Sequence, residues 1–499
     1  MAVPLTIGHN MGPGASAEGA VGDQTEQVDT GRISGKLLYM EQKAKGKGPE
    51  IRVKFIDIKY CDLWGRLRHV TIPAENLKSA VENGVGFDSS SVAGFGKVES
   101  GDMILKPDLD TAIVEPFTSE PTVSMFAEIY HPQTGQRYEH DPRYILQKAV
   151  STVKKTTGCD EIMLLPEFEF YLFTSAEFWT DESSAVYRVT SEELKHDDQT
   201  GTALFKGSAY HVAPPFDRSH DFRSQLVCLM NSCGIPVKYH HHEGGRFAQI
   251  EVEPGYLPAG RAGDAIILTK YLIRNLAFRQ GRTATFMPKP IYNEPGSGMH
   301  IHQYLVKKGA SLFGDRRSST GLSRLALNYI GGILEHLPAL CALTNPSTNS
   351  YRRLVPGYEA PTEAFFSIAN RTAAIRIPGY IRRPEKMALE YRVPDATANP
   401  YLALAAILLA GLDGIRRRLD PGLPQTVRGG TAEMRSRSTP VPSDLMQALR
   451  ELENDHQFLT GTGVFTEETI RKWIELKRIE AEAIARRPHP WEFNLYYGC

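Results

Sequence analysis

The stretch from Asn345 to Asn399 combines several arginine and glutamate side chains with short apolar runs. Its charged residues of interest are Arg353, Glu359, Arg371, Arg376, Glu390 and Arg392. Valine-, isoleucine- and phenylalanine-rich runs bounded by proline and glycine predict short buried strands. An unpaired charge among such strands is costly, so the arginines need anionic partners. Two interpretations are open: a set of surface salt bridges, or a site for phosphate and carboxylate groups, which suit the guanidinium fork.

Ionisable residues also recur two positions apart in strand-like segments upstream of this stretch. In EIMLLPEFEFYLF, Glu167 and Glu169 share one face, because successive side chains of a strand alternate. His300 and His302 share a face in GSGMHIH for the same reason. An exposed edge strand for the glutamates and a packed core for the histidines are the plainer alternatives. Two carboxylates on one apolar face repel each other unless a cation lies between them.

Four candidate strands therefore carry polar residues that would point to one side. These pairs are Glu167/Glu169, Glu243/Glu251, His300/His302 and Glu390/Arg392. The even offset between the members of the second pair places both on one face if both lie on strands. The pattern predicts strands curved round a polar cavity. Carboxylates with an imidazole, and no thiolate, suit Mg²⁺ or Mn²⁺. Two such ions would neutralise a transferring phosphoryl group, so the residues predict metal-dependent phosphoryl chemistry.

The whole chain has the size and composition of a globular protein. Its 499 residues are enough for two or more domains with a large core. A formal net charge of -1 gives no reason to expect nucleic acid or an anionic membrane as a partner. Six cysteines without CxxC spacing indicate a reducing compartment, and we expect a cytoplasmic protein. No apolar run in the sequence is long enough to span a bilayer.

Composition divides the chain into three parts. Residues 1–30 are rich in glycine, alanine and small polar residues, and predict a flexible extension. Residues 31–142 predict a small mixed β domain that begins with a hairpin around DLWG. A glycine- and serine-rich loop in this domain carries Asp88 and Asp102. Residues 143–499 predict a larger domain that combines strands and helices, which gives an α+β fold class.

Three segments of the larger part have clear helical or aromatic character. DPRYILQKAVSTVKKTTG predicts a helix with Asp141 as its N-cap. YLALAAILLAGLDGIRRRLDP predicts a helix buried in the core or in an oligomer contact. The last segment, RPHPWEFNLYYGC, is too aromatic to be a loose tail.

Several motifs together resemble the glutamine synthetase family, bacterial type I, from about Ile51 to the C terminus. These motifs are FDSSS, PEFEF, HHHE with Glu251 downstream, GSGMHIH, NPSTNSYRRLVPGYEAP, NRTAAIRIP, EYRVPDATANPY and RPHPWEFNLYY. The resemblance implies a β-grasp-like N-terminal domain and a catalytic domain whose curved antiparallel sheet forms a funnel backed by helices. It also implies active sites between neighbouring subunits, usually in a dodecamer of two hexameric rings.

The resemblance implies two divalent metal ions, Mg²⁺ or Mn²⁺, each held by three side chains. The ligands of one ion would be Glu169, Glu243 and Glu251. The ligands of the other would be Glu167, His300 and Glu390. The residues on the side of L-glutamate and the amine would be Arg353, Arg392, Gly296, Glu169, Tyr210 and Ser91. The residues on the side of ATP would be Arg371, Arg376, His302, Tyr304 and Tyr256.

The implied reaction has two steps. The γ-carboxylate of glutamate attacks ATP, and an amine then displaces phosphate from the acyl phosphate. Arg371 would face the γ-glutamyl phosphate. Glu359 would lie on a flap and take a proton from the attacking nitrogen. Asp88, supplied by the small domain of an adjacent subunit, would form part of an ammonium pocket with Tyr210.

The chain departs from the family pattern at several positions near the substrates. The replacements are Ser89 for glycine, Ala248 for the glycine of a GQ pair, Pro295 for asparagine, Tyr304 for serine, and Glu385 and Ala388 for basic residues, with Lys386 adjacent. Relatives that use aniline, methylamine, ethanolamine or polyamines vary at such edges, so the leading expectation is a γ-glutamylamide synthetase. The alternative is a glutamine synthetase that uses ammonium, and the third is an inactive regulator of the same fold.

Overall fold

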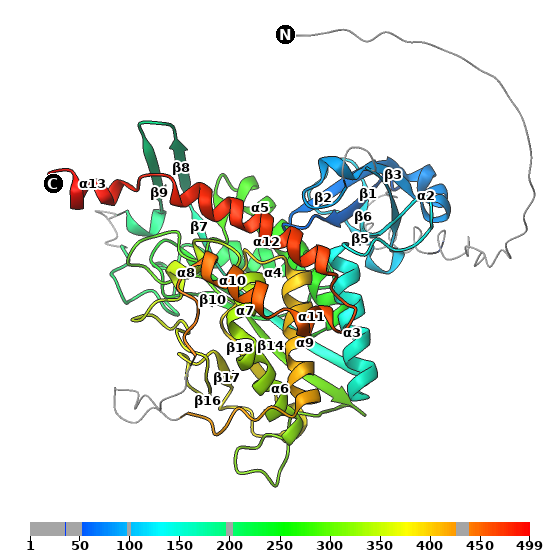
Figure 1. The fold of residues 1–499 in the computed structure, drawn as a ribbon. Helices are drawn as coiled ribbons and strands as arrows, with labels where there is room; N and C mark the ends of the chain where they lie inside the picture. Colours follow the sequence, from blue (N-terminus) through cyan, green and yellow to red (C-terminus); the bar gives the residue numbers. More distant parts are fainter. Residues whose placement is uncertain (1–34, 36–51, 97–100, 196–202, 426–438) are drawn as a thin grey trace, which may run out of the picture.

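The computed structural model describes residue 35 and residues 52–96, 101–195, 203–425 and 439–499. The extension expected over residues 1–30 lies outside these residues. Within them, a small N-terminal sheet, blue in Figure 1, lies beside a larger part that contains a second sheet and most of the helices. Both parts combine strands and helices, in agreement with the predicted α+β class.

The N-terminal sheet has six strands in the order β2-β1-β6-β4-β3, with β5 paired to β6. The strands are β1 (Phe55–Cys61), β2 (Leu67–Pro73), β3 (Val85–Asp88), β4 (Asp102–Pro107), β5 (Ile113–Val114) and β6 (Thr122–Tyr130). Strands β1 and β6 are parallel, and the other pairs are antiparallel. The antiparallel β1–β2 pair confirms the hairpin predicted around DLWG.

The prediction that a loop carries Asp88 and Asp102 is partly wrong. Asp88 is the last residue of β3, Asp102 is the first of β4, and the two are directly paired across these strands. The strand forms because Phe87 packs on Tyr60, with ring centroids 5.1 Å apart. This packing, together with the pairing of β3 to β4, overrides the preference of the neighbouring glycines and serines for loops.

The large sheet positions most of the candidate site residues. Its strand order is β10-β11-β7-β14-β18-β17-β16, with three short strands paired to β7 or β14. The main strands are β7 (Glu161–Phe173), β10 (Val237–His242), β11 (Gln249–Pro254), β14 (Met299–Lys307), β16 (Phe366–Ile368), β17 (Ile375–Ile377) and β18 (Leu389–Tyr391). The short strands are β12 (Leu257–Pro258), β13 (Thr283–Thr285) and β15 (Ala310–Ser311). Strand β7 is central, so its glutamates do not lie on an exposed edge.

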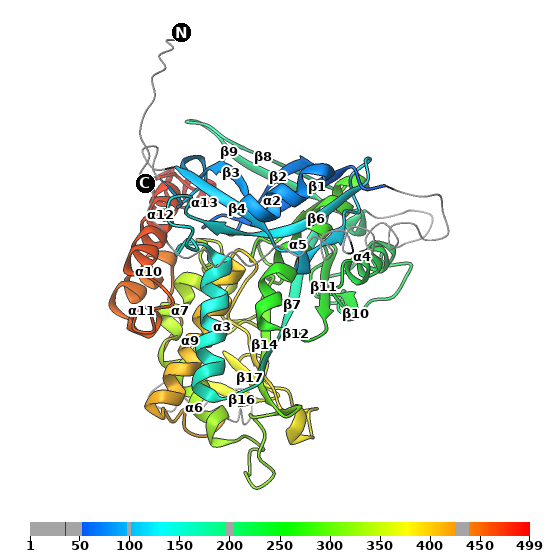
Figure 2. The ribbon, with the colours of Figure 1, turned by 90° about the vertical axis from the view of Figure 1, so that its right-hand side faces the viewer.

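Helices pack beside this sheet and bury its apolar side chains. In Figure 2, helices α3, α6 and α9 lie together on one side of strands β14 and β17. The longer helices are α3 (Pro142–Thr157), α4 (His220–Ser232), α5 (Ala259–Arg279), α6 (Arg324–Glu335), α9 (Pro400–Arg417), α10 (Leu445–Asn454) and α12 (Glu467–Ala485). The shorter ones are α2 (Leu77–Asn83), α7 (Leu337–Thr344), α8 (Ser350–Arg353), α11 (Gln457–Thr460) and α13 (Pro490–Tyr496). An additional hairpin is formed by β8 (Ser175–Thr180) and β9 (Ala185–Thr190).

Two sequence predictions about helices are confirmed by these elements. The Asp141 side chain accepts a hydrogen bond from the backbone N–H of Arg143 and caps α3. Helix α9 is buried over nearly its whole length, as its apolar sequence predicts. None of the described helices is by itself long and apolar enough to cross a bilayer; α6 and α7 pass that test only as a pair bent by 73°.

A buried lysine joins the N-terminal sheet to helix α5. The Nζ atom of Lys59, on β1, lies 2.6 Å from Asp57 and 2.8 Å from Glu115. The Tyr271 hydroxyl of α5 donates to Glu115 at 2.7 Å, and the Lys59 Nζ lies 5.0 Å from the Tyr271 ring centroid. The buried charges are therefore paired with one another, which a buried ion cluster requires.

Candidate active site

Glu167 is held between two imidazole rings. Strand β14 pairs with β7 so that His300 is directly opposite Glu167, and His302 lies on the same face. The Nδ1 of His300 is 2.8 Å from one Glu167 oxygen, and the Nε2 of His302 is 3.0 Å from the other. Burial raises the pKa of Glu167, but the two imidazoles outweigh it and hold this pKa well below its usual value.

Glu390 is fully buried and lies between two guanidinium groups. Strand β18 places it opposite His302. Its carboxylate accepts hydrogen bonds from Arg376 Nε and Arg392 Nη1, and lies 3.6 Å from His300 Nδ1. Burial raises the pKa of Glu390, whereas the charges of Arg392 and His302 lower it below its usual value. This part of the site keeps its acids ionised.

Glu243 and Glu251 lie at a second corner, where the acids have fewer cationic neighbours. Glu251, on β11, is directly opposite Glu169 on β7. Glu243 directly follows the last residue of β10 and is therefore not on a strand. The β10–β11 hairpin, rather than the even sequence offset, brings Glu243 close to Glu251. Burial and the charges of Glu169 and Glu251 raise the pKa of Glu243 to about 8. Burial and the charges of Glu167 and Glu169 raise the pKa of Glu251 well above its usual value.

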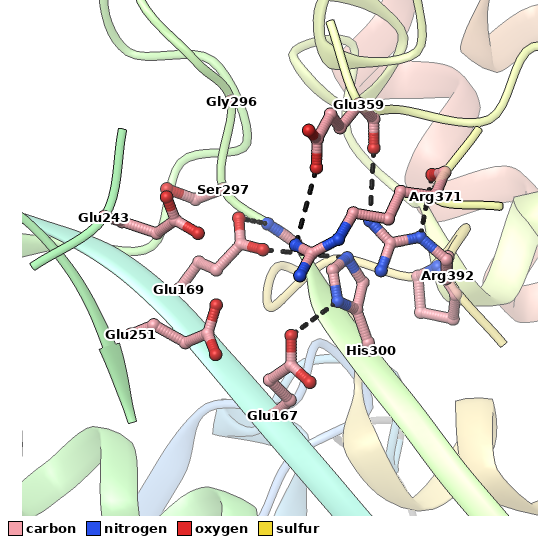
Figure 3. Close-up of polar contacts among 12 residues, drawn as sticks. Glu167, Glu169, Glu243, Glu251, Gly296, Ser297, His300, Glu359, Arg371 and Arg392 are labelled. Atoms are coloured by element: carbon pink, nitrogen blue, oxygen red, sulfur yellow. Dashed lines mark hydrogen bonds and ion pairs between the residues drawn. The ribbon is translucent and has the colours of Figure 1, made fainter. Parts of the chain in front are cut away.

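The carboxylates converge on one space. Figure 3 shows Glu167, Glu169, Glu243 and Glu251 directed toward a common region, with His300 at its edge. Four groups in the described chain have ligand atoms within 4.8 Å of one another. They are Glu167–Glu169–His300, Glu167–His302–Glu390, His241–Glu243–Glu251 and Glu167–Glu251–Glu253. Carboxylate oxygens with imidazole nitrogens, and with mutual repulsion that raises two pKa values, fit hard divalent cations.

Two further residues lie among the converging carboxylates and were not predicted from the sequence. His241 Nε2 lies 3.1 Å from a Glu251 oxygen. Glu253 is buried on the same strand as Glu251, and Lys238 lies 2.7 Å from it. The spacing of Glu251 and Glu253 repeats the i, i+2 pattern that drew attention to the glutamates of β7, so this signal was present in the sequence.

Arg353 is buried beside the acidic groups. Its Nη1 donates to the carbonyl of Val393 at 2.8 Å and its Nη2 to that of Arg392 at 3.0 Å. Its Nη2 is also 3.3 Å from His300 Nε2. A Cβ atom at Gly296 would lie 2.7 Å from the Arg353 Cγ, so this close approach requires glycine.

Glu359 and Arg371 meet above the acidic groups, as Figure 3 shows. An Arg371 Nη1 lies 3.5 Å from the Glu359 carboxylate. Arg392 donates to the Glu359 carbonyl at 3.2 Å and to the Arg371 carbonyl at 3.0 Å. Burial lowers the pKa of Arg371, but Glu359 and the Tyr210 hydroxyl reverse this and raise it. The Tyr210 ring stacks on His211 at a centroid distance of 4.1 Å.

The aromatic residues expected beside ATP form one group. The rings of Tyr256 and Tyr304 are 4.9 Å apart and nearly perpendicular. Burial, with smaller effects from Tyr304, raises the pKa of Tyr256. Both rings thus stay neutral and present an aromatic surface next to the strand that carries His302.

The positions that depart from the family pattern are scattered. The carbonyl of Pro295 accepts a hydrogen bond from Tyr171 at 2.6 Å. Ala388 is buried in the core, and Glu385 pairs with Arg316 at the surface. Lys386 is exposed. None of the contacts found for these residues in the described chain involves Glu359 or Tyr210.

Asp88 and Ser91 are not brought to this site within one chain. Asp88 accepts hydrogen bonds from the backbone N–H and hydroxyl of Ser90 and from the hydroxyl of Ser91. Strand β3, which ends at Asp88, lies far from β17 and β18 in Figure 1, and far from β17 in Figure 2. The other predicted residues gather round the large sheet.

Comparisons with known proteins cover almost the whole described chain. Residues 52–132 match the family model described as "Glutamine synthetase, beta-Grasp domain", and residues 139–496 match "Glutamine synthetase, catalytic domain". The chain is 43% identical to the glutamine synthetase of Aquifex aeolicus over 451 residues, which cover 89% of this chain and 96% of that one. It is 43% identical to the glutamine synthetase of Microchaete diplosiphon over 459 residues, 90% of this chain and 97% of that one.

Solved structures agree with these matches. Plasmodium falciparum glutamine synthetase superposes with a TM-score of 0.83 at 27% identity, covering 93% of this chain and 98% of that one. A structure titled "Apo GmaS without ligand" superposes with a TM-score of 0.75 at 27% identity, covering 90% of this chain and 97% of that one. The likeness confirms the predicted fold: a β-grasp domain and a catalytic domain with a curved sheet backed by helices.

Proposed function

Because the chain belongs to the glutamine synthetase family of ATP-dependent ligases, we propose that it couples the γ-carboxylate of L-glutamate to ammonium. The observation that carries the proposal is the convergence of buried carboxylates, imidazoles and guanidinium groups on one space. Such an arrangement suits the transfer of a phosphoryl group to a carboxylate, where negative charge must be held on both reactants.

Two divalent ions, Mg²⁺ or Mn²⁺, fit the acidic groups. Glu243, Glu251 and Glu169 would hold one ion, and Glu167, His300 and Glu390 the other; this list follows the family resemblance. The raised pKa values of Glu243 and Glu251 support a cation there, because burial and mutual repulsion outweigh the nearby His241 and Arg371. When bound, the ions would neutralise the ATP phosphates.

The arginines would bind and orient the substrates. Arg353, fixed by two backbone carbonyls beside Gly296, would face a carboxylate of glutamate. Arg371 and Arg376 would face the phosphates, with His302, Tyr256 and Tyr304 on the nucleotide side. Their fixed positions support catalysis by orientation, since the donors need not reorganise during the reaction.

Glu359 would accept the proton from the attacking nitrogen. It lies on a segment whose backbone is held by Arg392, and its carboxylate faces Arg371. In that position the carboxylate would act as the general base. Tyr210 lies beside the same arginine and would line the amine side of the site.

Ammonium is favoured over an organic amine by the place of the altered residues. Tyr304 packs on Tyr256, Ala388 is in the core, and Glu385 is at the surface, so these three departures are separate from Glu359 and Tyr210. Ser89 differs from them, because it directly follows Asp88. The curated relatives at 40–43% identity also bear the name glutamine synthetase. An organic amine is the second candidate, which Pro295 favours because it alters the segment that leads into Gly296.

We further propose a ring-shaped homo-oligomer in which Asp88 and Ser91 complete the amine pocket of a neighbouring subunit. Both residues are exposed, and strand β3, which ends at Asp88, is remote from the large sheet of its own chain. The family resemblance indicates a dodecamer of two hexameric rings.

An amine panel tests the proposal. Phosphate release and amide formation are measured with ATP, glutamate and Mg²⁺ or Mn²⁺, with ammonium, methylamine, ethanolamine, a polyamine or aniline at equal concentration. We expect the highest kcat/KM with ammonium. A higher value with one organic amine would establish the second candidate. Absence of stimulation by every amine would refute both and favour a regulatory protein.

A further inference from the structure

Two loops border the site, and a single lysine contacts both. The Gly296 loop comprises residues 287–298, between β13 and β14, and the Glu359 loop comprises residues 354–361, after α8. In Figure 3 the labelled residues of both loops lie above the acidic groups. Lys289, in the first loop, places its Nζ 3.5 Å from the ring centroid of Tyr358, in the second.

The Gly296 loop is anchored at both of its ends. The Lys289 N–H donates to Asn349 Oδ1 at 2.7 Å, and Asn349 Nδ2 donates back to the Lys289 carbonyl at 3.0 Å. Farther along the loop, the Glu294 carboxylate accepts from Arg246 Nη2 at 2.7 Å and from Arg246 Nε at 3.0 Å. The Lys289 Nζ donates to the Glu294 carbonyl and thereby closes the loop on itself.

The middle of the Glu359 loop, residues 355–359, is less firmly held than its ends: Leu354 and Ala360 are buried, and the Glu359 carbonyl accepts a hydrogen bond from Arg392 at 3.2 Å. It contains no helix or strand, and Gly357 adopts a left-handed φ of 91°, with nothing within 4 Å of a Cβ built there. Glu359 itself is exposed, and its 3.5 Å contact with Arg371 is long. The Tyr358 hydroxyl donates to Asn293 Oδ1 at 3.4 Å, again on the Gly296 loop. The Gly296 loop therefore supplies the cation and the hydrogen-bond acceptor found next to the Tyr358 side chain, in the exposed middle of the Glu359 loop.

We propose that Lys289 is a positioning residue that fastens the Glu359 loop to the Gly296 loop through the Tyr358 ring, so that the two loops cover the acyl phosphate together. The inference rests on the proposed function. A lysine ammonium over a tyrosine ring within about 6 Å is an attractive contact, and more so where water is excluded. Lys289 is half-buried, so water competes with this contact only in part.

The cost of losing this contact would be a side reaction with water. In the productive step the amine nitrogen bonds to the acyl carbon of the γ-glutamyl phosphate, gives up a proton to Glu359, and the bond from that carbon to the phosphate oxygen breaks. If the loop opens, water forms the new bond at the same carbon, phosphate leaves, and glutamate is regenerated. ATP is then hydrolysed without amide formation. Excluding water from a reactive intermediate is a recognised role of closing loops.

The test is the ratio of phosphate released to amide formed, at saturating ammonium. Lys289→Met keeps the length of the side chain and removes its charge, and we expect it to raise this ratio about two- to thirtyfold, the range equivalent to one cation–π contact. Lys289→Arg, which keeps a cation over the ring, should stay near the wild-type ratio. Lys155→Met, at the exposed end of α3, is the matched control and should leave the ratio unchanged.

A second measurement does not depend on activity. Hydrogen–deuterium exchange of residues 354–361 should be faster in Lys289→Met than in the wild type, without substrates. If Lys289→Met does not fold, Tyr358→Leu against Tyr358→Phe repeats the comparison, because only the first removes the ring. An unchanged ratio or unchanged exchange would overturn the proposal. Failure of the wild type to form any amide would refute the proposed function, while the exchange result would still decide the role of Lys289.

Discussion

Buried glutamates in this site differ in charge state because their immediate neighbours differ. Glu167 has an imidazole on each oxygen, and its pKa is lowered. For Glu243, burial and then the charges of two nearby carboxylates raise the pKa to about 8. One group of acids is therefore balanced by the protein, whereas the other requires protons or a cation to balance it.

This difference predicts how the metal-free protein responds to pH. Glu243 has an ordinary pKa of 4.5 when unfolded and one of about 8 when folded, so the folded state binds more protons between these values. The stability of the metal-free protein should therefore fall as pH rises from about 5 to about 8. A divalent ion replaces these protons, so the gain in Tm on adding Mg²⁺ or Mn²⁺ should increase over the same range. Thermal denaturation with and without metal measures both effects.

Glu243→Gln provides the control for the pH experiment. The substitution removes one of the repelling charges, so the variant should lose less stability as pH rises. It should also gain less from the metal ion. Equal gains in Tm at low and high pH in the wild type would contradict the assignment of a cation to this corner.

Glu359 makes a separate prediction at the scale of a residue. Glu359→Ala should reduce amide formation by about 10²- to 10⁴-fold, the contribution typical of a general base. Binding of ATP with Mg²⁺ should remain close to wild type, because Glu359 is exposed and belongs to none of the four groups of converging metal-ligand atoms. Steady-state kinetics and calorimetric titration measure the two effects. Unchanged turnover would remove Glu359 from the reaction.

At the scale of elements, strand periodicity predicted much of the site. The alternation of side chains placed Glu167 and Glu169 on one face of their strand, and His300 and His302 on one face of theirs; β7 and β14 confirm both and bring the two pairs to the same face of the sheet. The register between strands could not be predicted, because pairings such as Glu251 with Glu169 join segments remote in sequence. The local sequence also predicted a loop at Asp88, where packing of Phe87 and pairing with β4 give a strand in a glycine- and serine-rich segment.

Helices α6 and α9 approach so closely that glycine is required at the crossing. A Cβ atom at Gly332 would lie 2.1 Å from the Ala410 carbonyl oxygen, and one at Gly414 would lie 2.2 Å from that of Asn328. Gly332→Ala should therefore destabilise the protein by about 1–3 kcal/mol through overpacking. Gly260→Ala, in α5, has nothing within 4 Å of the added Cβ and serves as the control.

Thermal or urea denaturation compares these two glycine variants. We expect the Gly332 variant to unfold first and the Gly260 variant to equal or exceed the wild type, since alanine favours helix. If both variants unfold like the wild type, the close approach of α6 to α9 at Gly332 would be refuted.

At the scale of the whole molecule, one chain lacks part of the proposed amine pocket. Asp88 lies in the small sheet, whereas Glu359 and Tyr210 border the large one. No pattern in the sequence shows which copy of Asp88 serves which site, because this depends on packing between chains. The family resemblance, rather than any local signal, predicted that a neighbouring subunit supplies it.

Mixed oligomers test this arrangement. Asp88→Ala and Glu359→Ala chains should each be weakly active alone. Co-assembled in equal amounts, they should recover about one quarter of the wild-type amide formation, because that share of sites receives an intact residue from each of two neighbours. Mixing the two proteins after separate assembly is the control. No recovery in the co-assembled oligomers would place Asp88 outside the site of a neighbour.

The junction around Lys59 constrains any attempt to move the small domain onto another ligase. The lysine and its acids lie in that domain, but the hydroxyl that completes their hydrogen bonds belongs to Tyr271 in the catalytic part. A graft that kept the first three residues and replaced the tyrosine would leave Glu115 short of a donor in a buried place. The transplantable unit is thus larger than the domain itself and must include a piece of α5.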